Sequence, residues 1–353
     1  MRDDLNPPAL LARTVDDITS AWIGRVLDVG DAQVERVQAI GTGQMSQNYR
    51  VEFCVGGEPR TAVVKLASNN ETSRATGVQM RAYWREVQFY RNLAPKVGWP
   101  VPRCDLAVQD ESDGWFTLVL EDVVGGSQGD QIAGCTVEEA RTALASLAAI
   151  QAPVLGKPDV AGAWLNLPNM LSQELLGSLL PAFLERYAGR IKPAHAEVCR
   201  RFVSCLDAWW LSKGAPEGLV HGDFRLDNLL FTADSAAVVD WQTVMWGPAL
   251  LDAAYFLGGA LSPQERQTHE RELIREYHAD LMSRGVEGLG WEQCWDEYRK
   301  WSFWGLTMVI GASMLVVQTE RGDDMFMTLL DRACSQILDL NAVELLPAQV
   351  AVS

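Results

Sequence analysis

The sequence has 353 residues, of which 48% are hydrophobic, and a formal net charge of -16. This length predicts two domains or one large two-lobed domain, with enough apolar residues to form a core. The acidic balance argues against nucleic acid or an anionic membrane as the main partner, because both bind basic patches.

The N-terminal segment predicts a single amphipathic helix. Residues 1–8 lack the apolar run of a secretory signal peptide, so we expect a cytoplasmic protein. Residues 14–28 open with Thr14 and Asp17, which have the spacing of a capping box, and apolar residues then recur at helical spacing. We expect this helix to lie on the first lobe without a role in chemistry.

Three predicted strands follow, at residues 34–40, 49–55 and 61–66, with Gly56-Gly57 as a hairpin turn. The loop of residues 41–48 between the first two strands is small and polar. Glycine lets a backbone approach a phosphate closely, so such a loop can place N–H groups over a nucleotide. Taken alone, the loop is more typical of an ordinary hairpin, and only the motifs later in the chain favour the phosphate-binding interpretation.

Lys65 closes the third predicted strand, and residues 82–90 follow as a helix with Glu86 beside its apolar face. A lone lysine at a strand end usually faces solvent, but Glu86 is well placed on the next helix, and we expect an ion pair between Lys65 and Glu86. A later strand at residues 115–120 leads into Glu121, and an acidic, glycine-containing turn follows it.

The second half of the chain is predicted to be mostly helical. Thr136 and Glu139 form a capping box before a helix that continues to Ala152. Further helices are predicted at residues 181–191, 197–213 and 263–282.

The run of residues 301–318 is nearly long enough to span a bilayer. Serine, threonine and glycine residues interrupt it, so we predict a buried core helix and no membrane span. Seven scattered cysteines without Cys-x-x-Cys spacing predict neither a zinc site nor a disulfide framework.

The most informative stretch is Leu219-Val220-His221-Gly222-Asp223-Phe224-Arg225-Leu226-Asp227-Asn228-Leu229-Leu230-Phe231, followed by Val238-Val239-Asp240-Trp241-Gln242. Its short apolar runs predict buried strands, which place the polar residues at strand ends. Asn228 and Asp240 offer the oxygen ligands that Mg²⁺ prefers, and Asp223 remains as a proton acceptor. Asp223 and Asn228 have the separation of the catalytic-loop Asp and Asn of protein kinases.

This stretch resembles the motif of the aminoglycoside phosphotransferase and choline kinase superfamily, in which glycine replaces the arginine of His-Arg-Asp. Leu118-Val119-Leu120-Glu121-Asp122 and Leu251-Asp252-Ala253-Ala254-Tyr255-Phe256-Leu257 look most like its ecdysteroid-kinase-like branch and bacterial relatives. The resemblance implies an α+β, bilobal protein-kinase-like fold. A small β-rich N-lobe would comprise residues 1–122, and a larger, mostly helical C-lobe residues 123–353.

The resemblance also implies ATP and Mg²⁺ as cofactors and gives the motif residues their roles. Asp223 would accept or orient the proton of a substrate hydroxyl, and Arg225 would neutralise charge on the transferred group. Asn228 and Asp240 would hold Mg²⁺. The expected nucleotide contacts are Gly41, Gly43, Ser46, Lys65 and Glu86, with backbone groups near Glu121 and Val123 at the adenine.

Three further residues take expectations from the resemblance. His221 would brace the catalytic loop, and Asp252 would brace it through buried hydrogen bonds. Relatives often carry a histidine near the end of the helix that starts after Thr136, where this chain has Gln151. Because of this difference, the sequence does not indicate which acceptor molecule the site binds.

The predicted function is ATP- and Mg²⁺-dependent O-phosphotransfer to a hydroxyl of a small lipophilic molecule, such as a steroid or related alcohol. Eight tryptophans between Trp209 and Trp304 favour an apolar pocket wall, although core packing explains them equally well. The alternatives are a hydroxyacyl-CoA kinase, an aminoglycoside or choline-type kinase, and a pseudokinase that binds nucleotide without transfer. A Mg²⁺-dependent hydrolase fits poorly with the upstream lysine and glycine-rich loop. The acceptor, the choice between ATP and GTP, and the oligomeric state stay open.

Overall fold

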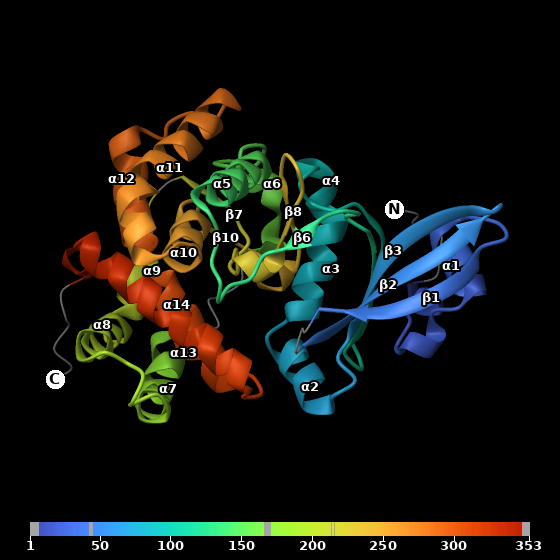
Figure 1. Ribbon diagram of the computed structural model, residues 1–353, viewed down its shortest axis with the longest axis horizontal. Coiled ribbons are helices and arrows are strands. Elements are labelled where there is room, and N and C mark those ends of the chain that lie inside the picture. Colours follow the sequence, from blue (N-terminus) through green and yellow to red (C-terminus); the bar gives the residue numbers. More distant parts are fainter. Residues whose placement is uncertain (1–6, 42–44, 166–170, 213, 215, 348–353) are drawn as a thin grey trace. The chain divides into compact units, whose positions relative to one another are not determined.

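The computed structural model describes residues 7–41, 45–165, 171–212, 214 and 216–347. The chain divides into two compact units (Figure 1). Unit 1 consists of Met1–Gly125 together with Val239–Val244, and unit 2 of Gly126–Val238 and Met245–Ser353. The predicted α+β class is confirmed, because a five-stranded antiparallel sheet precedes a mostly helical part.

The sheet of unit 1 has the strand order β1-β2-β3-β5-β4, and every neighbouring pair is antiparallel. The four strands predicted from the sequence are present. Gly56 and Gly57 connect β2 to β3 with φ of 58° and 85°, the left-handed conformation that a two-residue hairpin turn needs. The bounds are β1 Gln33–Ile40, β2 Ser46–Val55, β3 Glu58–Ala67, β4 Cys104–Asp110 and β5 Trp115–Glu121.

The leading helix begins later than the sequence predicts. The capping box of Thr14 and Asp17 closes a short 3-10 turn at Val15–Asp17, and Thr19 then caps α1 by accepting from the N–H of Trp22. The chain bends between the two because Ile18 leaves the helical conformation. The helices of unit 1 are α1 Ser20–Leu27, α2 Glu71–Gln79, α3 Ala82–Asn92 and α4 Ala94–Val97.

The two faces of the sheet carry different partners. Side chains alternate along a strand, so Val64 points into the core shared with α1, and Lys65 points to the opposite face. Lys65 pairs across β3 and β5 with Leu118, which lies on the same face as Phe116. The ring of Tyr83 in α3 stacks on Phe116 with centroids 4.4 Å apart. The alternation therefore directs Lys65 toward α3.

Unit 2 is built around α10, whose residues are all buried. Two small sheets accompany the helices, one pairing β7 with β10 and the other ordered β6-β8-β9. The helices are α5 Val137–Gln151, α6 Pro158–Ala161, α7 Gln173–Arg186, α8 Pro193–Val203, α9 Leu206–Leu211, α10 Leu251–Ala260, α11 Pro263–Ser283, α12 Trp291–Trp301, α13 Trp304–Leu315 and α14 Glu320–Asp339. The strands are β6 Ser127–Gln128, β7 Glu217–Val220, β8 Leu229–Phe231, β9 Ala236–Val238 and β10 Met245–Pro248.

The first part of the apolar run, residues 301–313, lies in the core of unit 2 as predicted, but not as one helix, and Leu315 and Val317 at its end are exposed. Helix α12 ends at Trp301, and α13 begins at Trp304 after a short break. Across the described part of the chain, helices of the length and apolarity needed to cross a membrane are absent.

Most of the tryptophans counted in the sequence are core residues. Trp209 and Trp301 are fully buried with their rings 4.6 Å apart, and Trp304 is 2% exposed. Trp241 and Trp246 are buried as well. Core packing therefore accounts for these five side chains, and they form no exposed aromatic wall.

Candidate active site

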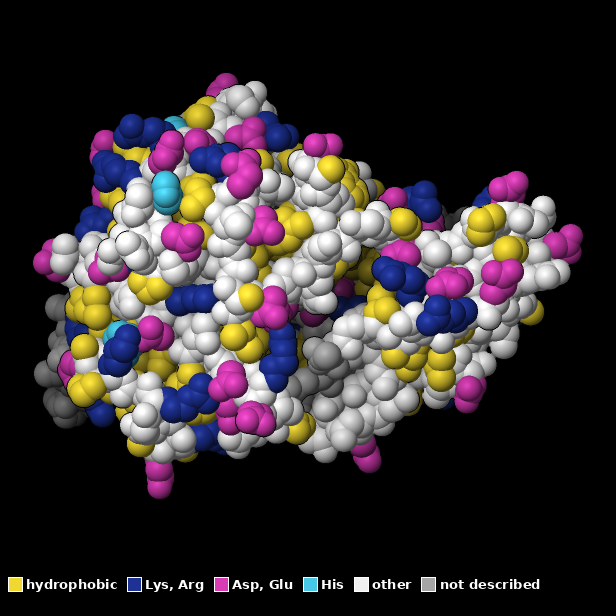
Figure 2. All heavy atoms as spheres, in the orientation of Figure 1, with side chains coloured by type: hydrophobic (Ala, Val, Ile, Leu, Met, Phe, Trp, Pro, Cys, Tyr) yellow, Lys and Arg dark blue, Asp and Glu magenta, His cyan; other side chains and the backbone are white. Residues whose placement is uncertain are grey.

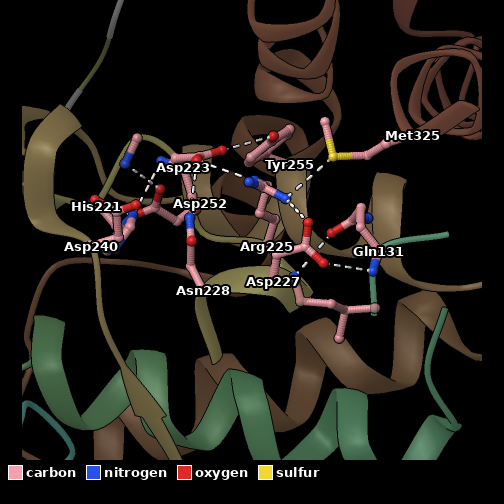
Figure 3. Close-up of polar contacts among 12 residues, drawn as sticks. Gln131, His221, Asp223, Arg225, Asp227, Asn228, Asp240, Asp252, Tyr255 and Met325 are labelled. Atoms are coloured by element: carbon pink, nitrogen blue, oxygen red, sulfur yellow. Dashed lines mark hydrogen bonds and ion pairs between the residues drawn. The ribbon is translucent and has the colours of Figure 1, made fainter. Parts of the chain in front are cut away.

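Three side-chain donors hold Asp223, two from the motif loop of residues 221–228 and one from α10 (Figure 3). The hydroxyl of Tyr255 donates to Oδ1 at 3.0 Å. Oδ2 accepts from Nε of Arg225 at 3.1 Å and from Nδ2 of Asn228 at 2.9 Å. The side chain of Asp223 remains 20% exposed to solvent. The carboxylate is thus fixed in orientation and still open to a small molecule.

Asn228 is oriented by the same residue. Its Nδ2 also donates to the backbone oxygen of Asp223 at 2.9 Å, so both N–H groups are directed at Asp223. The amide oxygen, a hard ligand suited to Mg²⁺, is the remaining polar atom of this side chain.

Asp252 braces the start of the loop from α10. Its fully buried carboxylate accepts from the backbone N–H of His221 at 2.6 Å and of Gly222 at 2.9 Å. Burial raises the pKa of Asp252 to about 7, against the opposing effect of these two donors. Nδ1 of His221 in turn accepts from the N–H of Asp223 at 3.2 Å. The bracing contacts expected for His221 and Asp252 are therefore present.

Arg225 lies between two carboxylates. Nε donates to Asp223 and Nη1 to Asp227. Burial disfavours the charge of the guanidinium, but the carboxylates, Asp223 first, outweigh it and keep the pKa of Arg225 above its usual value. Holding Asp223 is a role that the sequence did not indicate. Neutralisation of the transferred group by Arg225 stays a prediction.

In unit 1, Lys65 forms the ion pair that the sequence predicts. Its Nζ lies 2.8 Å from the carboxylate of Glu86 in α3 and 2.9 Å from Oδ1 of Asp240. Burial lowers the pKa of Lys65, but Asp240 and Glu86 outweigh it, and the pKa lies above its usual value. Glu86 shares this single ammonium with Asp240, so burial prevails there and raises its pKa to about 6.

Residues 239–244 are held on α3. The ring of Trp241 stacks on Phe89 with centroids 3.9 Å apart, and the backbone N–H of Trp241 donates to Oε1 of Glu86 at 3.3 Å. Asp240 adopts the left-handed conformation with φ of 68°. These contacts bring Asp240 and Lys65 together within unit 1, whereas Asp223 and Asn228 belong to unit 2.

The remaining predicted nucleotide residues lie at element ends. Gly41 follows β1 with φ of 71°, and Ser46 begins β2, with Oγ 3.5 Å from Nε2 of Gln242. Gly43 lies outside the described residues. Glu121 ends β5 and Val123 is buried just after it. Their roles toward nucleotide stay predictions.

Several residues around Asp223 were not predicted from the sequence to belong to the site. Tyr255 follows Asp252 by three positions, so both lie on one face of α10, and that spacing could have indicated it. Asp227 lies inside the motif itself. Gln151 donates to the backbone oxygens of Leu219 and Ala249 at 3.1 and 3.0 Å, which ties the end of α5 to the strand before the loop.

Comparison with known proteins identifies the family. A family model described as the phosphotransferase enzyme family, APH, matches residues 36–293, which is well over half of the chain. The chain belongs to this family. The narrower likeness to the ecdysteroid-kinase-like branch stays a prediction.

One curated relative is named as a different kind of enzyme from the phosphotransferases. A protein from Arabidopsis thaliana, named probable acyl-CoA dehydrogenase IBR3, is 24% identical over 232 residues. The match covers 62% of this chain and 27% of that protein, so the chain spans only a minor part of its relative.

Two solved structures show the same fold. A candidate aminoglycoside phosphotransferase from Ralstonia eutropha has a TM-score of 0.54 and 16% identity, with 93% of this chain and 98% of that chain covered. The GDP complex of aminoglycoside 2'-phosphotransferase-IIIa has a TM-score of 0.53 and 14% identity, with 86% and 94% covered.

Proposed function

We propose that this member of the phosphotransferase family uses ATP and Mg²⁺ to phosphorylate a hydroxyl group of a small molecule. The observation that carries the proposal is the buried ion pair of Lys65 and Glu86, 2.8 Å apart. In kinases, a lysine on β3 and a glutamate on the next helix position the ammonium for the nucleotide phosphates. Burying two such charges adds little to stability, so the pair is better explained by phosphate binding than by folding.

Asp223 is the group that would receive the proton of the acceptor hydroxyl. As the hydroxyl oxygen forms its bond to the γ-phosphorus, the bond from phosphorus to ADP breaks and the proton passes to the carboxylate. Tyr255, Arg225 and Asn228 hold this carboxylate in one orientation. Orientation is the main contribution that a protein makes to phosphoryl transfer.

The oxygen donors of the motif fit Mg²⁺. Asn228 would bind through its amide oxygen and Asp240 through its carboxylate, and both are ligands of the hard type that this ion prefers. When bound, the ion would neutralise charge on the phosphate oxygens. Gly41, Gly43 and Ser46 would contribute to phosphate binding.

The choice of nucleotide enters the test as well. Backbone groups near Glu121 and Val123 would contact the base. One solved relative is a GDP complex, so GTP belongs beside ATP in the assay.

Two acceptor classes follow from different observations. A lipophilic alcohol, steroid-like or related, follows from the sequence resemblance, but the buried tryptophans no longer support it. A hydroxyacyl-CoA is favoured by the Arabidopsis relative, which is named a probable acyl-CoA dehydrogenase. Such a thioester presents a hydroxyl on an apolar chain, so it also meets the requirement for a lipophilic acceptor.

The test is nucleotide consumption by the purified protein with Mg²⁺ against hydroxyacyl-CoAs, hydroxylated steroids, terpenoids, aromatic alcohols and aminoglycosides. We expect one class to give a phosphate ester, identified by mass, with one nucleoside diphosphate formed per ester. Nucleotide binding without ester formation on any acceptor would favour the pseudokinase alternative and count against the proposal.

A further inference from the structure

The guanidinium of Arg225 joins two carboxylates within the catalytic loop (Figure 3). Its Nε donates to Oδ2 of Asp223 at 3.1 Å, and its Nη1 donates to Oδ2 of Asp227. The three side chains are between 15% and 20% exposed, so water screens the interaction only partly. Because the guanidinium is planar and rigid, fixing one nitrogen fixes the direction of the others.

Asp227 is held from the other side by Gln131. Oδ1 of Asp227 accepts from the backbone N–H of Gln131 at 3.0 Å, so each of its two oxygens has a separate partner. Nε2 of Gln128 also donates to the backbone oxygen of Asp227 at 2.6 Å. The carboxylate therefore cannot turn toward Arg225 with both oxygens without losing a backbone donor.

Gln131 is anchored to two helices. It is 1% exposed, its Oε1 accepts from the N–H of Leu226 at 3.0 Å, and its Nε2 donates to the backbone oxygen of Gly259 in α10 at 2.8 Å. Arg332 of α14 donates to the backbone oxygens of Gln131 at 2.9 Å and of Gly259 at 2.8 Å. Gln131 thus binds the loop through its backbone N–H and Oε1, and the helical core through Nε2 and its backbone oxygen.

Helix α10 supports the loop at both ends. Before Asp223, the carboxylate of Asp252 accepts from the loop backbone, and the hydroxyl of Tyr255 donates to Asp223 itself. After Asp223, the backbone oxygen of Gly259 accepts from Gln131, and Gln131 in turn contacts the last residues of the loop. From this arrangement we infer that Asp227 and Gln131 are positioning residues for the transfer step, acting on Asp223 through Arg225. The inference rests on the proposed function.

The physical reason is competition for one guanidinium. In the structure, Arg225 divides its N–H groups between two carboxylates and gives Asp223 only Nε. Without the charge of Asp227, the guanidinium can turn and bind Asp223 through two parallel N–H groups, a strong arrangement for this pair. Asp223 is then reoriented and less available to the acceptor hydroxyl.

The experiment is a double-mutant cycle with Asp227→Asn and Arg225→Met, measured as kcat and as KM for the nucleotide. We expect Asp227→Asn alone to lower kcat about tenfold and leave KM for the nucleotide unchanged, since Lys65 and Glu86 are in unit 1. In the Arg225→Met background, the same substitution should change kcat less than about twofold. A purely structural role would not produce this dependence on Arg225.

One matched control and one further test variant separate the effect from misfolding. Asp234→Asn changes an exposed aspartate in the turn between β8 and β9 and should leave kcat unaltered. Gln131→Leu removes the side-chain bonds to Leu226 and Gly259, and we expect a fall in kcat that also shrinks when Arg225 is replaced.

Equal effects of Asp227→Asn with and without Arg225 would overturn the inference, as would a loss of kcat that only follows the loss of folded protein in thermal unfolding. Failure of the proposed function is distinguishable, because the unsubstituted protein would then give no phosphate ester at all. The inference would fall with it.

Discussion

Asn228 directs both N–H groups of its amide at Asp223, one to the backbone oxygen and one to Oδ2, each at 2.9 Å. One side chain therefore holds the proposed base and, in the proposed function, would present its own amide oxygen to Mg²⁺. Different atoms of Asn228 would perform these two roles, and truncation of the side chain removes both.

Substitution of Asn228 should raise the requirement for Mg²⁺. We expect Asn228→Ala to increase the Mg²⁺ concentration for half-maximal activity and to lower kcat about a hundredfold, because one ligand and one donor to Asp223 are lost. Titration of activity with Mg²⁺ at saturating nucleotide measures both. An unchanged Mg²⁺ requirement would exclude Asn228 as a ligand.

Tyr255→Phe should lower kcat about tenfold without changing KM for the nucleotide, because Oδ1 of Asp223 loses its only described side-chain donor. The matched control is Tyr298→Phe, another buried tyrosine of unit 2, whose hydroxyl donates to Glu270 at 3.0 Å. It should affect thermal stability and leave kcat intact. Similar kinetics in the two variants would mean that the contact of Tyr255 with Asp223 has no catalytic effect.

Glu86→Gln should weaken nucleotide binding. The variant keeps the shape of the side chain but removes one of the two charges that hold Lys65, so the ammonium is held by Asp240 alone. We expect KM for ATP to rise about tenfold. Glu58→Gln, at an exposed position of the same strand as Lys65, serves as the control and should leave KM unaltered. No change in Glu86→Gln would remove the main support for phosphate binding at this pair.

Asp252 should make folding stability depend on pH. Its pKa is raised from 3.8 to about 7 by burial. Between these values the folded protein holds a proton that the unfolded chain has released, so the contribution of Asp252 to the free energy of unfolding is complete below pH 4 and falls as the pH rises to about 7. Urea unfolding of the natural protein and of Asp252→Asn measures the difference across this range. A difference independent of pH would show that Asp252 titrates normally.

Local pattern was enough to predict part of the site. Lys65 at the end of a strand and Glu86 beside an apolar helix face follow from periodicity, and Asp223 and Asn228 follow from the spacing of one motif. Asp223 and Asn228 meet through short-range geometry, and alternation along β3 directs Lys65 to the face of the sheet that carries α3.

The rest of the site depends on packing between distant segments. Tyr255 reaches Asp223 across 32 residues, and Gln131 reaches Asp227 across 96, so neither contact follows from local pattern. The position of Asp240 beside Lys65 depends on the stacking of Trp241 on α3. The break after Trp301 was equally hidden, because the apolar run continues through it.

Asp223→Asn tests the central claim most directly. The variant keeps the size of the side chain and its ability to accept from Tyr255, but it cannot take up the proton of an acceptor hydroxyl. Phosphate ester formation is measured for both proteins at saturating nucleotide with the best acceptor of the panel. We predict a fall in kcat of about 10² to 10⁴ with nucleotide affinity retained. Turnover at the rate of the unsubstituted protein would contradict the assignment of Asp223 as the base.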